Sequence, residues 1–125
     1  MPGWSKKNFA DITDRSPNDT MEWRLSRRDI GSRELGVSRF TYSAGARMPF
    51  GHRHREQEEV YVIVGGSGRA KLDDEIVEVA EWDLLRVAPE VMRAFEAGPE
   101  GLDVLCIGGR RPEGGEAERD EAFWT

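Results

Sequence analysis

Short apolar segments separated by turn-forming residues fill most of the chain from Gly36 onward. They recur at intervals of about eight to twelve residues, and no helical period of useful length lies between them. This spacing is typical of an antiparallel sandwich or barrel and predicts an all-β fold. The predicted strands cover 36–43, 58–64, 68–73, 76–80, 84–88, 92–96 and 102–107.

The pattern divides the chain into three regions. Residues 1–35 are polar and weakly patterned, and we expect them to pack on the barrel as an N-terminal extension. Residues 36–108 supply the barrel, and a chain of 125 residues has room for one modest core. Residues 109–125 are rich in Glu and Gly but end in Phe123-Trp124, which indicates a short C-terminal arm with an aromatic anchor.

Composition narrows the range of partners. A net charge of -6 and a pI near 5.0 argue against nucleic acid and anionic membranes, and we interpret clusters such as Arg27-Arg28 as solvated surface. No apolar segment approaches the ~20 residues of a membrane span, and the N-terminus lacks a signal-peptide core, so we expect a cytoplasmic protein. Cys106 lies in an apolar run, which predicts a packed thiol rather than a nucleophile.

The two histidines of the chain, His52 and His54, are one residue apart, and Glu59 begins the apolar segment that follows them. On an extended strand alternate side chains share a face, so both imidazoles project to the same side and Glu59 can return to it after a short turn. Two imidazoles and a carboxylate form a site for a divalent transition metal. Glu56 is the weaker carboxylate candidate. If the two imidazoles and Glu59 do not converge, the alternative interpretation is that the histidines are two partly exposed residues at the start of a strand.

This segment resembles the first motif of the cupin superfamily. Gly45 precedes the His-x-His pair, Glu59 follows after four residues, and the strand 60–64 runs into Gly65-Gly66. The second cupin motif is altered. Pro89 is retained after the strand 84–87, but Arg93 stands where the family has its last metal-binding histidine.

The resemblance covers about residues 36–108 and is to the small, single-domain "cupin 2"-like members. It implies a double-stranded β-helix, or jelly roll, usually packed as a homodimer, with a small-molecule pocket inside the barrel. It also implies a divalent metal, Fe, Mn, Ni or Zn, on His52, His54 and Glu59. Since cupins catalyse many reactions, the fold does not select one.

Arg93 leaves three alternatives, because a guanidinium cannot ligate a metal. It can pair with Glu59 in a former metal site, where the salt bridge replaces the metal. It can also hold the carboxylate or phosphate of a substrate beside the metal, or point outward. Tyr61, Phe95 and Arg47 are further candidates for substrate contact, Arg47 at the mouth of the pocket.

Two functional hypotheses follow. The first is a metal-dependent enzyme, a dioxygenase or an isomerase, acting on a small anionic substrate. The second is a non-catalytic module that binds an anion or sugar in a pocket with a degenerate metal site. A structural dimer with a vestigial pocket is a weaker third reading.

Overall fold

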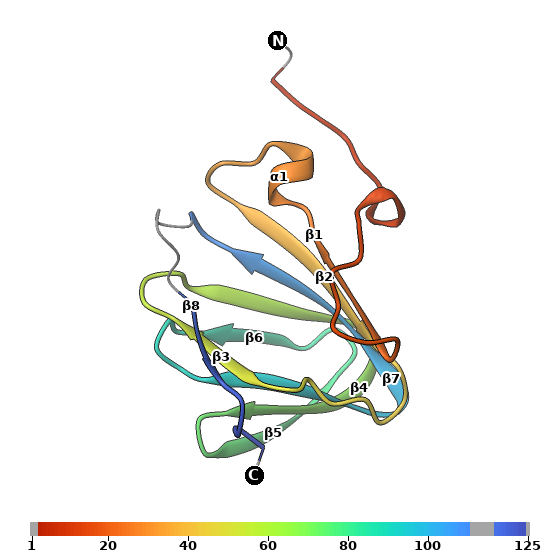
Figure 1. Cartoon of the computed structure of the whole chain (residues 1–125), viewed down its shortest axis with the longest axis vertical. Coiled ribbons are helices and arrows are strands. Elements are labelled where there is room, and N and C mark those ends of the chain that lie inside the picture. Colours follow the sequence, from red (N-terminus) through yellow and green to blue (C-terminus); the bar gives the residue numbers. More distant parts are fainter. Residues whose placement is uncertain (1–2, 111–116, 125) are drawn as a thin grey trace.

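The computed structural model describes residues 3–110 and 117–124, and these residues form an antiparallel β-fold (Figure 1). The sequence prediction of an all-β chain is confirmed. In chain order the elements are η1 (Phe9–Asp11), β1 (Met21–Leu25), α1 (Arg27–Ile30), β2 (Gly36–Tyr42), β3 (Gly51–His54), β4 (Glu59–Leu72), β5 (Glu75–Ala80), β6 (Leu84–Val87), β7 (Arg93–Gly108) and β8 (Ala117–Asp120).

Two long strands, β4 and β7, hold the fold together. The first half of β4 pairs with β6 and with the second half of β7, whose other neighbour is β2. The second half of β4 pairs with β5 and with the first half of β7. The sheet therefore curls back on itself. The sequence predicted two strands in place of each long one, because glycines interrupt the apolar pattern.

The bend in these strands depends on glycine. Gly66 has a φ of 73°, and a Cβ built on it would lie 2.0 Å from the carbonyl oxygen of Gly101 on β7. Only glycine tolerates both the left-handed backbone and this close approach. The glycines between the predicted strands 58–64 and 68–73 therefore form a bend within one strand, β4, and not a loop between two strands.

Buried apolar side chains form a core inside the curled sheet. Alternate residues of β4 and β7 point inward, so that Ile63 and Val104 are almost fully buried. Met48, Phe50, Tyr61, Phe95 and Cys106 are also buried in this core.

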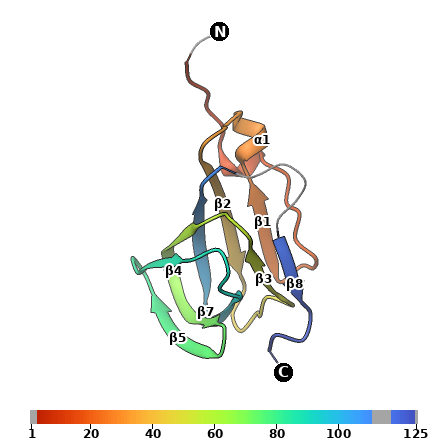
Figure 2. The same cartoon turned by 90° about the vertical axis from the view of Figure 1, so that its left-hand side faces the viewer.

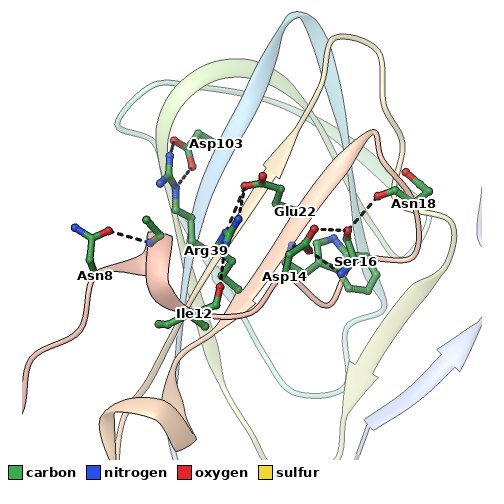
Figure 3. A network of polar contacts seen from close by, with 11 residues as sticks. Asn8, Ile12, Asp14, Ser16, Asn18, Glu22, Arg39 and Asp103 are labelled. Atoms are coloured by element: carbon green, nitrogen blue, oxygen red, sulfur yellow. Dashed lines mark hydrogen bonds and ion pairs between the residues drawn. The ribbon is translucent and has the colours of Figure 1, made fainter.

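The N-terminal segment contributes a strand that the sequence analysis did not predict. β1 pairs with β2 along its whole length, from Met21 opposite Tyr42 to Leu25 opposite Ser38. Ahead of β1, the Asp14 carboxylate accepts hydrogen bonds from the backbone N–H of Trp23 and of Ser16 (Figure 3). These contacts hold the turn at Asp14 and Ser16 against β1.

The C-terminal arm lies alongside β3, on the edge away from β7 (Figures 1 and 2). β8 pairs with all four residues of β3, whereas β7 pairs with β3 only through His52 and Arg93. Phe123 is buried beside Gly51, and the Trp124 indole donates to the Met48 carbonyl at 2.8 Å. Residues 111–116 of the predicted arm lie outside the described residues.

Within the described residues, no helix has both the length and the apolar character needed to cross a membrane.

Candidate metal centre

His52 and His54 are carried by β3, as alternation along a strand requires. His52 is partly buried, Arg53 between them is exposed, and His54 is buried. Their rings meet nearly at right angles, with centroids 5.2 Å apart. The backbone N–H of His54 donates to the Pro89 carbonyl at 2.7 Å, which adds to the bonds that hold β3 in place.

Glu59 begins β4 and turns its carboxylate toward both rings. Its Oε1 lies 3.7 Å from Nε2 of His52 and 3.4 Å from Nε2 of His54. Ligand atoms of the three residues lie within 4.8 Å of one another. The neighbouring Glu58 pairs outside with Arg86 at 2.8 Å, so it faces away from the cluster.

Two buried donors orient the Glu59 carboxylate. The Tyr61 hydroxyl donates to Oε1 at 2.7 Å, and the Cys106 thiol donates to Oε2 at 3.1 Å. Tyr61 shares the inward face of β4 with Glu59, while Cys106 reaches it from β7. Cys106 is buried, as the sequence predicted.

The surroundings set the protonation of these groups. Burial favours a raised pKa for Glu59, but hydrogen bonds from His52, His54 and Tyr61 outweigh it and hold the pKa well below its usual range. Burial lowers the pKa of His52, although Glu59 opposes this effect. Burial also raises the pKa of the Cys106 thiol well above its usual value, so the thiol stays protonated. An ionised carboxylate beside a neutral imidazole is the state that binds a metal.

The donor atoms fit a transition metal. Two ligands about 2.1 Å from an ion, at a tetrahedral angle, are about 3.4 Å apart. The separations of 3.4 and 3.7 Å from Glu59 Oε1 to the two Nε2 atoms are close to that value. Little movement would therefore be needed to bring the three donors of His52, His54 and Glu59 onto one ion.

Arg93 begins β7 directly opposite His52 and is fully buried. Its Nη2 donates to the Ala88 carbonyl at 2.8 Å, and its Nη1 lies 3.7 Å from Glu59 Oε1. Nε and Nη1 have no hydrogen-bond partner among the described residues. The outward orientation is therefore wrong, because the guanidinium lies against the cluster.

A cavity of about 160 Å³ opens beside the cluster. Strands β1, β2, β3, β4 and β7, together with α1 and the β3–β4 turn, supply its walls. Its lining residues are Leu25, Arg27, Gly36, Ser38, Phe40, His52, His54, Gln57, Glu59, Cys106 and Gly108. His52 also lines a much smaller apolar space of about 20 Å³, together with Tyr61 and Phe95.

The remaining predicted site residues lie in different places. Phe95 packs against Tyr61 with ring centroids 4.9 Å apart, inside the barrel and close to the cluster. Arg47 lies outside it, because its guanidinium pairs with Glu96 at 2.6 Å and stacks 4.4 Å from the centroid of the Trp124 ring. The structure therefore brings Phe95 and Tyr61 toward the cluster but not Arg47.

Gln57 and Arg27 are two of the cavity-lining residues that the sequence analysis did not name as site residues. Gln57 lies in the turn between His54 and Glu59, and its proximity to the motif was a usable signal. Arg27 comes from α1, far from both motifs, and no sequence pattern identified it.

Sequence comparison gives a partial match to an uncharacterized protein. No protein-family model matches the sequence. An uncharacterized protein of Methanocaldococcus jannaschii, MJ1618, is 36% identical over 56 residues, and the match covers 44% of this chain and 45% of that protein. The matched segment thus spans less than half of that relative.

Solved structures match most of the described fold. A cupin protein from Bacteroides fragilis, BF4112, has a TM-score of 0.75 and 27% identity over 92% of this chain and 91% of its own. Oxalate decarboxylase from Bacillus subtilis has a TM-score of 0.80 and 22% identity over 95% of this chain but 32% of its own. KdgF from Halomonas sp. has a TM-score of 0.70 and 12% identity over 90% and 97% of the two chains.

Fold and cluster together define a small β-barrel protein of the cupin class. The curled sheet matches solved cupins, and His52, His54 and Glu59 converge as the first cupin motif implies. We therefore identify the chain as a cupin.

Proposed function

We propose that this cupin binds a divalent transition metal and handles a small anionic molecule beside it. One observation carries the proposal. Donor atoms of His52, His54 and Glu59 gather within 4.8 Å, next to a buried guanidinium, that of Arg93, with two N–H-bearing nitrogens lacking partners among the described residues. Buried donors of this kind usually have a partner, so a ligand or water is expected at Arg93.

The donor set supports Fe(II), Mn, Ni or Zn, because imidazole and carboxylate ligands suit all four. Manganese has a parallel among the structural neighbours, since Mn(II) centres are described for Bacillus subtilis oxalate decarboxylase. A bound ion would supply Lewis-acid polarisation of an oxygen atom on the substrate.

The chain's own residues would then have separate roles at the site. Arg93 orients the anionic group through Nε and Nη1, and Tyr61 keeps the Glu59 carboxylate directed at the ion through its 2.7 Å hydrogen bond. Phe95 supports the Tyr61 ring. We propose dioxygenation and isomerisation as the two reactions, since a metal beside a held anion can serve either.

A second candidate is a non-catalytic binding module in which Arg93 replaces the metal. The 3.7 Å separation of Arg93 Nη1 and Glu59 Oε1 favours it, because a guanidinium beside the carboxylate already balances its charge. In this case the pocket recognises an anion or sugar through Arg93 alone.

Elemental analysis separates the two candidates. Protein made without a histidine tag is incubated with Fe(II), Mn, Ni and Zn in turn, desalted and analysed. We expect close to one ion per chain, lost in His52→Ala. Substoichiometric metal under all four conditions would reject the metal-dependent function and favour the binding module.

We also propose a cytoplasmic homodimer formed through the outer face of the sheet. Leu84 on β6 and Trp82, two residues before it, are among the large apolar side chains that are exposed. Leu84 stands opposite Val62 on that face, where a second copy would cover both.

A further inference from the structure

The strand that carries both histidines receives most of its backbone pairing from the C-terminal arm. β3 lies between β7 and β8 in the sheet, and Figure 2 shows β8 alongside it. In the part of the chain that the structure describes, its register with β7 consists of one pair, His52 opposite Arg93, whereas all four residues of β3 pair with β8. The placement of His52 and His54 therefore depends on an element far away in the sequence.

Two aromatic residues anchor the arm beside β3. The Phe123 ring is buried, and a Cβ on Gly51 would lie 2.5 Å from its Cδ2 atom, so the ring packs directly against the first residue of β3. The Lys71 ammonium, on β4, lies 4.4 Å from the centroid of this ring and donates to the Phe123 carbonyl. The Trp124 indole donates to the Met48 carbonyl at 2.8 Å. These contacts tie the end of the arm to the start of β3.

Side chains near the β3–β8 pairing add two further contacts. Arg53, which stands between the two histidines, donates to the Glu118 carboxylate at 2.7 and 2.9 Å. The Arg119 guanidinium lies 4.1 Å from the centroid of the Phe50 ring. Exposed ion pairs such as the first contribute little stability, whereas a buried aromatic ring contributes much more. We therefore expect Phe123 to be the main anchor.

We propose that residues 117–124 of the C-terminal arm position the metal centre, with Phe123 as the positioning residue. Docking of the arm holds β3 where His52 and His54 face Glu59. When the arm is undocked, β3 loses most of its backbone pairing, and the three donors no longer gather on one ion. The apparent affinity for the ion then falls with the fraction of molecules in which the arm is docked. The inference rests on the proposed metal-binding function, although the coupling of the arm to β3 is measurable without metal.

The Zn²⁺ affinity of Phe123→Ala tests the proposal in the full chain. The dissociation constant, measured by competition with a chromophoric chelator, should rise at least about tenfold, because the arm is docked in a smaller fraction of the molecules. Phe123→Leu keeps an apolar side chain at the same place and should stay within about threefold of the wild type.

Leu102→Ala is the matched control for stability. Leu102 is buried on β7 opposite Gly66, at the far end of the first half of β4 from Glu59. Truncating a buried leucine and truncating a buried phenylalanine cost similar stability, so both variants should unfold at lower urea concentration. Leu102→Ala should nevertheless keep its Zn²⁺ affinity within about twofold of the wild type, because additive effects are expected for distant sites. A difference between the variants reports positioning rather than general destabilisation.

Amide hydrogen exchange follows the coupling directly. In metal-free Phe123→Ala, the amides of β3 should exchange at least about tenfold faster relative to those of β6, because β3 opens when the arm undocks. Leu102→Ala should leave this ratio unchanged. In the wild type, Zn²⁺ should slow exchange in β8 as well as in β3, since the coupling between metal binding and arm docking is reciprocal.

Equal losses of Zn²⁺ affinity in Phe123→Ala and Leu102→Ala would overturn the proposal. So would an unchanged affinity or an unchanged exchange ratio in Phe123→Ala, or wild-type β8 amides whose exchange does not respond to bound Zn²⁺. If the wild type binds no Zn²⁺, the proposed metal-dependent function fails, but the exchange ratio in metal-free protein still decides whether the arm positions β3.

Discussion

Replacing Arg93 by methionine is expected to tighten metal binding. Arg93 is fully buried with its Nη1 3.7 Å from Glu59 Oε1, and methionine keeps an unbranched apolar stem of similar reach without the charge. The substitution therefore removes a cation beside the metal while leaving His52, His54 and Glu59 in place. It also frees Glu59 from a competing positive partner.

The size of the effect follows from the geometry. An ion held about 2 Å from Glu59 Oε1 would lie about 5 Å from the Arg93 guanidinium. At that distance, with an effective dielectric constant near 20, two unit charges interact by about 3 kcal/mol. Salt and local relaxation reduce this value, but half of it still changes affinity about tenfold. We therefore expect the dissociation constant for Zn²⁺ to fall at least tenfold.

Competition with a chromophoric chelator measures this constant in a buffer without carboxylates, because a bound anion would mask the repulsion. Arg86→Met is the matched control, since Arg86 is exposed and pairs with Glu58 on the outer face. It changes the net charge equally and should leave the affinity within about twofold. A folded Arg93→Met protein that binds Zn²⁺ less tightly than the wild type would refute the electrostatic reasoning.

Three other expectations concern the ligands, the arm and the outer face. His54→Ala should weaken Zn²⁺ binding at least about a hundredfold in the same competition, since it removes one of three ligands, and unchanged affinity would exclude His54 from the site. Phe123→Ala should lower the free energy of unfolding by about 3 kcal/mol in urea titration, because Phe123 is buried beside Gly51, and a loss below ~1 kcal/mol would mean that the arm is not anchored. The wild type should sediment as a dimer at micromolar concentration and Leu84→Lys as a monomer, whereas a wild-type monomer would contradict the proposed interface.

The sequence predicted the buried strands better than the exposed ones. The first half of β4 was identifiable because a continuous apolar run marks it as a strand. β8, with the sequence Ala-Glu-Arg-Asp, is an edge strand whose polar side chains carry no hydrophobic signal. β3 was not among the predicted strand ranges, although an extended backbone was assumed for His52 and His54, because its four residues are mostly polar and its pairing depends on the distant C-terminal arm.

For the site, the sequence predicted the residues that are close together in the chain better than those that are distant. His52, His54 and Glu59 are close in the sequence, so strand alternation and a short turn were enough to predict that they would meet. Arg27 joins the cavity only because α1 folds over the start of β2 and the end of β7, which no local pattern encodes. Arg93 was located by its motif, but its burial and the direction of its side chain needed the structure.

Crystals of the protein soaked in Mn²⁺ or Zn²⁺ and measured at the absorption edge of the metal give the most direct test. We expect one anomalous peak per chain, about 2.0–2.3 Å from Nε2 of His52, Nε2 of His54 and a carboxylate oxygen of Glu59. A saturating soak that leaves this position without a peak, or places the ion on other residues, would contradict a metal-binding role for the cluster.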